Sequence, residues 1–152
     1  MTTLELREDS YDSPVAQELI AGVQAEYVVR YGDPDETPVD PTEFVPPNGL
    51  FLVGYLDGIA VATGAFRRHA ENAVEIKRMY VVPEARGKGL SRVMLAALEH
   101  RARLAGASRV VLETGNLQPE AISLYASSGY ERIPGFGHYA CAPGSISFAK
   151  KL

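Results

Sequence analysis

Residues 81–92 read VVPEARGKGLSR and join a predicted strand to the start of a long predicted helix. Gly87 and Gly89 let the backbone approach a ligand without a Cβ in the way. Successive loop amides followed by a helix N-terminus form a cradle for an anion. Arg86, Lys88 and Arg92 add positive charge around it, a combination that suits a pyrophosphate.

Two common phosphate-binding motifs do not fit this stretch. A Walker loop needs a glycine where Val82 stands and a serine or threonine where Gly89 stands. The dinucleotide fingerprint of Rossmann folds lacks its third glycine, because Arg92 occupies that place. The stretch therefore predicts an anion site of another kind at the junction of strand and helix.

Apolar periodicity predicts the elements around this loop. The predicted strands cover residues 3–8, 50–56, 59–67, 74–82, 109–113, 130–133 and 145–150, and the predicted helices cover residues 14–32, 90–105 and 119–129. The hairpin turn Asp57-Gly58 makes the early strands an antiparallel meander. A strand–helix–strand crossover makes the strands at 74–82 and 109–113 parallel. The fold class is thus α/β (α+β), with a twisted, mostly antiparallel mixed sheet flanked by helices.

Residues 33–49 are rich in turn formers and acids and have no apolar period. Two interpretations of this segment stay open. In the first, its acidic residues form a solvated loop, which is the usual meaning of such a run. In the second, they form a lid over the acceptor site that favours cationic amines. Those residues are Asp33, Asp35, Glu36, Asp40 and Glu43.

Composition bounds the remaining possibilities. The chain has 152 residues, of which 46% are hydrophobic and 22% charged, as expected for a single domain over residues 1–152. A net charge of −4 argues against nucleic-acid binding, and one cysteine excludes an intramolecular disulfide framework. The three histidines are scattered and do not have the spacing of metal ligands, so we expect no metal site. The absence of an apolar run of about 20 residues or a signal-like start predicts a cytoplasmic protein without membrane contact.

Two motifs resemble segments of the GCN5-related N-acetyltransferase (GNAT) superfamily. The family signature Gln/Arg-x-x-Gly-x-Gly/Ala is similar to residues 86–91, which read RGKGLS. Ser91 departs from the pattern, but serine is small and its amide remains available. The later family segment Ala-x-x-Leu-Tyr-x-x-x-Gly-Phe/Tyr is matched by residues 121–130, AISLYASSGY. The resemblance covers about residues 50–135.

This resemblance implies a GNAT fold, with the parallel strand pair splayed at the cofactor site, and acetyl-CoA as cosubstrate. In the family, the backbone at Met79, Tyr80 and Val81 pairs with the pantetheine arm, and the Val81 amide polarises the thioester carbonyl. The resemblance also implies that the residues binding the pyrophosphate are Arg86, Gly87, Lys88, Gly89, Leu90, Ser91 and Arg92. Some relatives place an asparagine near the cofactor at the Asn116 position; capping of the following helix is the alternative for this region.

The resemblance also implies two side chains for proton transfer. Tyr125 occupies the position of a tyrosine that protonates the departing CoA thiolate, and Glu75 that of a glutamate serving as general base in some members. Each has a structural alternative. If the roles are structural, Tyr125 is an aromatic residue of the core, and Glu75 is a surface residue with Lys77 on the same face of its strand.

The resemblance therefore implies an acyl-CoA-dependent N-acetyltransferase. It would move an acetyl group from acetyl-CoA to a primary amine of a small molecule, by direct attack in a ternary complex, and a homodimer would fit many relatives. The alternatives are a protein N-terminal or lysine acetyltransferase and a non-catalytic CoA-binding sensor. An acceptor cleft closed by residues 33–49 would favour the small amine, and an open, shallow cleft would favour a protein.

Overall fold

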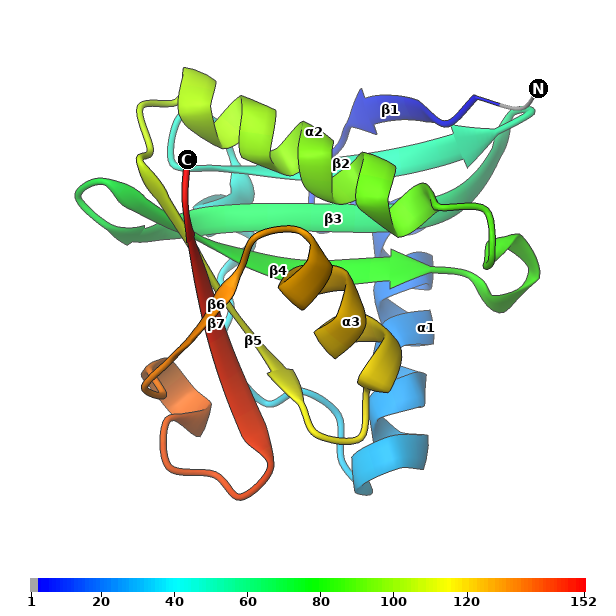
Figure 1. The fold of residues 1–152 in the computed structure, drawn as a ribbon. Coiled ribbons are helices and arrows are strands. Elements are labelled where there is room, and N and C mark those ends of the chain that lie inside the picture. The colour runs from blue at the N-terminus through cyan, green and yellow to red at the C-terminus, as the bar shows by residue number, and fades with distance from the viewer. Residues whose placement is uncertain (1–2) are drawn as a thin grey trace.

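The computed structural model describes residues 3–152 (Figure 1). Seven strands form one sheet in the order β1-β2-β3-β4-β5-β7-β6. The strands are β1 (Glu5–Glu8), β2 (Gly49–Leu56), β3 (Ile59–Ala70), β4 (Ala73–Val81), β5 (Arg109–Gly115), β6 (Glu131–Ile133) and β7 (Ser145–Lys151). The helices are α1 (Pro14–Tyr31), α2 (Leu90–Leu104) and α3 (Pro119–Ser127). The β4–β5 pair is parallel and the other pairs are antiparallel, which confirms the predicted mixed sheet.

Local sequence signals set the ends of the first helix. The Ser13 side chain accepts a hydrogen bond from the amide of Ala16, and Pro14 occupies the first helical position. Gly32 ends the helix in the left-handed conformation, with φ of 87°. None of the helices within residues 3–152 has the length and apolar character needed to span a bilayer.

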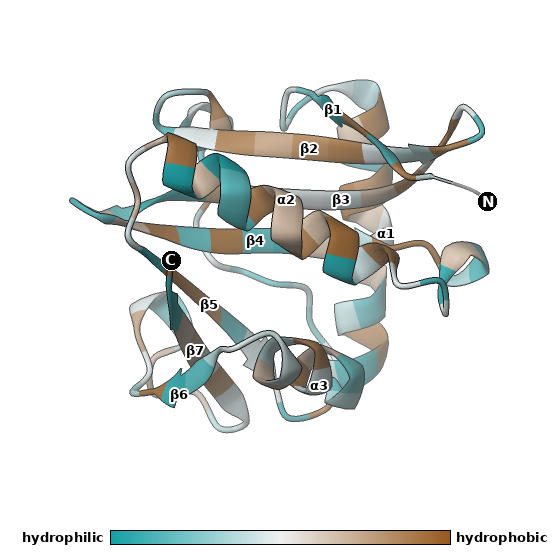
Figure 2. Ribbon diagram, turned by 45° about the horizontal axis from the view of Figure 1, so that its top comes forward, coloured by the Kyte–Doolittle hydropathy of each residue, from teal (hydrophilic) through white to brown (hydrophobic). Residues whose placement is uncertain are grey.

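The two faces of the sheet carry different layers. Helices α2 and α3 cover one face, while α1 crosses the other (Figure 1). The larger apolar cluster lies under α2 and includes Phe66, Ile76 and Met94, whereas a smaller one under α1 includes Phe44 and Phe51. In Figure 2 the strand β2 is mostly brown, and α2 alternates between brown and teal. The sheet is thus buried between its helices, and α2 also presents a polar side to solvent.

A bulge in β4 separates β4 from β5. The two strands pair only where Ala73–Glu75 meet Arg109–Val111, and beyond this point they diverge (Figure 1). Arg78 has φ of 57°, and the register with β3 shifts beside it. The hydroxyl of Thr63 donates a hydrogen bond of 2.7 Å to the Arg78 carbonyl, which holds the bulge in place. The result is a gap between the two strands near the middle of the sheet.

Candidate active site

The loop between β4 and α2 has the geometry of an anion site. Gly87 and Gly89 both lie in the left-handed region, with φ of 79° and 76°. Gly89 is the N-cap of α2, and no side chain caps this end of the helix. The amide groups of the first helical turn are therefore left open to a ligand. Lys88 lies exposed between the two glycines.

A cavity of about 260 Å³ begins at this loop. It is walled by α1, the end of β4, the loop and α3: Val23, Glu26, Tyr27, Arg30, Met79, Tyr80, Val81, Ala85, Arg86, Gly87, Gly89, Leu90, Ser91, Gln118, Glu120, Ala121, Leu124 and Tyr125. Arg30 of α1 reaches across to α3, where it forms an ion pair of 2.5 Å with Glu120. The cavity thus joins the predicted phosphate loop to the predicted pantetheine strand.

Arg86 lines this cavity, whereas the predicted cofactor residues Arg92 and Asn116 lie outside its wall. Arg86 turns back toward the protein, donating to the Val81 carbonyl at 2.9 Å and to Glu26 at 2.5 Å. Arg92, in the first turn of α2, donates to the hydroxyl of Ser127 at 2.7 Å. Asn116 lies in the turn after β5, outside the cavity wall, where its amide donates to the Gly144 carbonyl at 2.8 Å.

Tyr125 lies on α3 and contributes to the same cavity. Its ring packs 5.7 Å from Tyr130 and 6.0 Å from Phe148, measured between centroids. Burial raises the pKa of the Tyr125 hydroxyl well above its ordinary value, so the group is protonated at neutral pH. The residue is therefore both a core aromatic and a proton-bearing group at the cavity wall.

A second cavity, of about 300 Å³, lies beside β4 on the α1 face of the sheet. Its wall combines the segment between α1 and β2, called here the 33–48 segment, with the end of β3, β4, β5 and the turn after β6. The lining residues are Thr37, Pro38, Glu43, Arg67, Arg68, His69, Glu75, Glu113, Phe136, Gly137 and His138. Glu75 and Tyr125, the two predicted proton-transfer residues, thus line different cavities.

Glu75 is buried and held by two cations. Only 5% of the residue is exposed, so it is not the surface residue of the structural alternative. Its Oε1 accepts from Arg67 at 3.1 Å, and its Oε2 lies 4.0 Å from the Lys77 ammonium. Arg67 is itself shared, because it also pairs with Glu43 at 3.0 Å.

Glu113, on β5, is a second carboxylate in this cavity, and sequence reasoning missed it. Its Oε2 is buried and has no hydrogen-bond partner within residues 3–152. Burial raises the pKa of Glu113 to about 7; the Lys77 charge opposes this rise, whereas Glu75 and Asp35 add to it. The one available sequence signal was an acid at the end of an otherwise apolar strand, VVLE.

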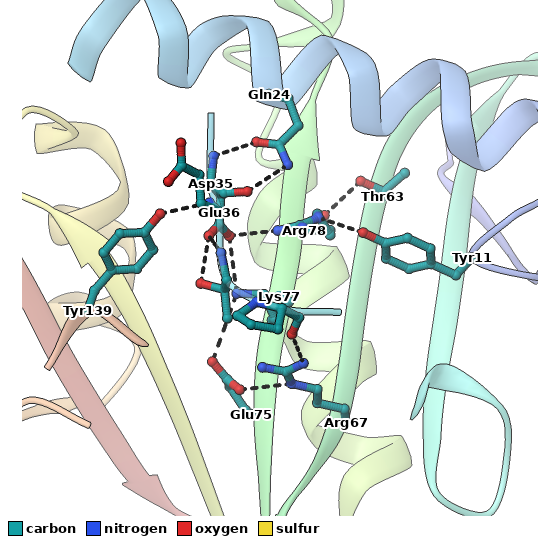
Figure 3. A network of polar contacts seen from close by, with 12 residues as sticks. Tyr11, Gln24, Asp35, Glu36, Thr63, Arg67, Glu75, Lys77, Arg78 and Tyr139 are labelled. Atoms are coloured by element: carbon teal, nitrogen blue, oxygen red, sulfur yellow. Dashed lines mark hydrogen bonds and ion pairs between the residues drawn. The ribbon is translucent and has the colours of Figure 1, made fainter. Parts of the chain in front are cut away.

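The acidic residues of the 33–48 segment do not all have the same surroundings. Asp35 is bound by Lys77 and Arg78 (Figure 3). Asp40 caps a short 3-10 helix, and Glu43 binds Arg67. Asp40 is exposed, as the solvated-loop interpretation expects. Asp35 and Glu43 instead hold the segment against the sheet, because each pairs with a cation on β3 or β4.

Comparisons with known proteins agree with this geometry. The model of the acetyltransferase (GNAT) family matches residues 16–130. An IAA acetyltransferase of Azospirillum brasilense is 39% identical over 107 residues, 70% of each chain. An N-acetylaspartate synthetase of Rattus norvegicus is 36% identical over 108 residues. The matched region is 70% of this chain and 36% of the length of that protein.

Solved structures show the same fold. A Klebsiella pneumoniae structure described as an acyl-CoA N-acyltransferase superposes with a TM-score of 0.83 at 30% identity, covering 100% of this chain and 98% of the other. The PaiA N-acetyltransferase of Thermoplasma acidophilum, solved with coenzyme A, gives a TM-score of 0.75 at 17% identity and covers 99% of both chains.

Proposed function

The chain belongs to the GNAT family of acetyltransferases, and from its two cavities we propose that it transfers an acetyl group from acetyl-CoA to a primary amine of a small molecule. The observation that carries the proposal is the pair of cavities. One joins a glycine-containing anion loop to a protonated tyrosine, and the other holds a partly buried carboxylate, one oxygen of which has no hydrogen-bond partner in the described part of the chain.

The first cavity suits the cosubstrate of the family, which supplies an acetyl thioester when bound. Solved neighbours hold coenzyme A or acetyl-CoA. The amides from Gly87 to Arg92 would bind the pyrophosphate, because the loop and the uncapped start of α2 leave them open. Beyond Glu75, β4 has no strand partner on its β5 side within residues 3–152. The backbone of Met79, Tyr80 and Val81 is therefore available to the pantetheine amides.

Glu113 and Tyr125 have protonation states that suit opposite halves of the reaction. Glu113 takes one proton from the incoming ammonium, and the freed nitrogen bonds to the acetyl carbon as the carbon–sulfur bond breaks. The nitrogen loses its remaining surplus proton to solvent as the neutral amide forms. Tyr125 gives its proton to the departing sulfur. Glu75, the base implied by the family resemblance, already pairs with Arg67 at 3.1 Å and lies 4.0 Å from the Lys77 ammonium, whereas Oε2 of Glu113 has no hydrogen-bond partner within residues 3–152 and is the freer of the two to accept a proton.

The second cavity favours a small acceptor. Its volume of about 300 Å³ stands at the lower end of the range for ligand pockets. The 33–48 segment and the turn after β6 both contribute to its wall, so an acceptor enters between them. A folded protein would require a more open groove for its side chain and flanking backbone. The N-acetylaspartate synthetase among the relatives is itself named for an acetylated amino acid.

Release of free thiol from acetyl-CoA tests the proposal against amino acids, polyamines, aminoglycosides, aromatic amines and short peptides. Saturable transfer to a small amine, identified by the mass of its product, would support it. Transfer to peptides alone would indicate a protein N-terminal or lysine acetyltransferase. Acetyl-CoA binding by calorimetry without transfer to any amine would indicate a sensor module. The Tyr125→Phe variant is the matched control for thiol release by the protein itself.

A further inference from the structure

Asp35 is bound through all of its polar side-chain atoms. Its Oδ2 accepts from the Lys77 ammonium at 3.1 Å and from the Arg78 guanidinium at 2.7 Å. Its Oδ1 accepts from the amide of Thr37 at 3.0 Å and from its hydroxyl at 2.7 Å. Figure 3 shows this carboxylate at the centre of the polar network. Saturation of both oxygens is unusual for an acid in a surface loop.

The backbone on either side of this carboxylate is held as well. Gln24 of α1 accepts from the Asp35 amide at 2.7 Å and donates to its carbonyl at 3.2 Å. The amide of Glu36 donates to the Tyr139 hydroxyl at 2.7 Å. The 33–48 segment is therefore fixed from α1, from β4 and from the turn after β6, which places Asp35 at a defined point over the sheet.

Lys77 is the cation for which the carboxylates of this region compete. Its ammonium lies 3.1 Å from Asp35 and 4.0 Å from Glu75. The same charge acts on Glu113, for which it is the strongest neighbouring cation. An ammonium stabilises whichever carboxylate it approaches, and the effect decreases with distance. The position of Lys77 therefore modulates how readily Glu113 holds a proton, although burial is the larger influence.

Lys77 and Glu113 each lie two residues beyond the paired positions Glu75 and Val111 of the neighbouring strands β4 and β5, yet the ammonium binds Asp35 and Oε2 of Glu113 has no hydrogen-bond partner within residues 3–152. We propose that Asp35 is a positioning residue for the acetyl transfer, because it binds the Lys77 ammonium, keeps it from pairing with Glu113 and so preserves Glu113 as a proton acceptor. This inference rests on the proposed function in assigning the base to Glu113. Asp35 acts only through Lys77 and through its own charge, and contacts neither cavity. The role accounts for a half-buried, fully bonded acid in a segment that otherwise resembles a loop.

Other charged groups surround Glu113, and they are unchanged when Asp35 is replaced. Glu75 on β4, Arg67 on β3 and Tyr139 in the turn after β6 interact with it electrostatically. The cavity wall also carries Glu43, Arg68, His69 and His138. The Asp35→Asn variant removes one negative charge and releases the cations that it binds, Lys77 and Arg78. Both changes favour the ionised form of Glu113, so they lower its pKa.

Carbon-13 NMR titration of the glutamate carboxyls measures this directly in the folded protein, with Glu113 assigned by the loss of its signal in Glu113→Gln. Asp35→Asn should move the Glu113 midpoint down by roughly one pH unit, a tenfold change in proton affinity. Adding Lys77→Gln to Asp35→Asn should restore the midpoint to near the wild-type value. Tyr139→Phe, which removes one anchor of the 33–48 segment without changing a charge, should leave the Glu113 midpoint in place.

An unmoved midpoint in Asp35→Asn would overturn the proposal. Equal lowering in Asp35→Asn and in the double variant would overturn it too, because opening of the segment would then be the cause. If Asp35→Asn does not fold, the single variant Lys77→Gln decides: removal of the ammonium must raise the Glu113 midpoint. These measurements need no turnover, so a failure to find an amine acceptor would count against the proposed function alone.

Discussion

Replacement of Glu113 by glutamine should abolish the acid limb of the pH–rate profile. Because burial raises the pKa of Glu113 to about 7, its ionised fraction is about one tenth at pH 6 and about nine tenths at pH 8. If the ionised form takes the ammonium proton, kcat/KM of the wild type rises about tenfold over this interval. Glutamine keeps the shape of the side chain but accepts no proton, and the remaining rate should fall by about a hundredfold or more.

The assay is initial thiol release from acetyl-CoA between pH 5.5 and 9, with two acceptors whose amine pKa values differ. The part of the pH–rate profile that reports the amine pKa moves when the acceptor is changed. The part that reports the Glu113 pKa stays at the same pH. Glu75→Gln is the matched control, since it removes a carboxylate from the same cavity. Loss of the Glu75 charge lowers the pKa of Glu113, so its limb should persist at a lower pH.

A Glu113→Gln variant that keeps both the limb near pH 7 and the wild-type plateau would refute this reasoning. Loss of the limb in Glu75→Gln instead would assign the base to Glu75. Circular dichroism and thermal unfolding of each variant separate these outcomes from misfolding. Both substitutions replace a carboxylate by an amide of equal size, so each leaves the packing of the cavity nearly unchanged.

Three further outcomes follow from the same structure. Tyr125→Phe should lower kcat by about a hundredfold and leave the Kd for acetyl-CoA, measured by calorimetry, within about twofold. Gly89→Ala forces a side chain into φ of 76° and should weaken acetyl-CoA binding about fivefold, whereas Gly58→Ala, at φ of 81° in the hairpin turn, should affect only stability. Burial alone would raise the pKa of Asp35, but Lys77, Thr37 and Arg78 lower it well below the ordinary 3.8. Its contribution to the free energy of unfolding is therefore full above about pH 4 and decreases at more acidic pH, and urea titrations should show this decrease to be smaller in Asp35→Asn.

Sequence signals were sufficient where the structure depends on neighbours along the chain. The serine cap at residue 13, the left-handed glycine at residue 32 and the glycines at residues 87 and 89 each act within one turn of backbone. The crossover from β4 through α2 to β5 follows from the handedness and reach of such a connection. These features gave the mixed sheet, its parallel pair and the anion loop.

The electrostatics of the second cavity depend on pairs far apart in sequence. Asp35 meets Lys77 and Arg78 at separations of 42 and 43 residues, and no local pattern reveals such partners. Without them, the acids of the 33–48 segment resemble a solvated run. Glu113 was missed for a related reason. Strand alternation gives its face of the sheet, but its lack of a partner follows only from the packing around it.

Arg78 is held through both its backbone and its side chain. Its φ of 57° is unfavourable for a residue with a Cβ and costs on the order of 1–3 kcal/mol, so other contacts must hold it. Thr63 binds its carbonyl, while Asp35 and Tyr11 bind its guanidinium. The backbone bulge opens the gap between β4 and β5 next to Met79, and the side chain fixes Asp35 above Lys77. A single strained residue thus ties the shape of the cofactor strand to the charge that surrounds Glu113.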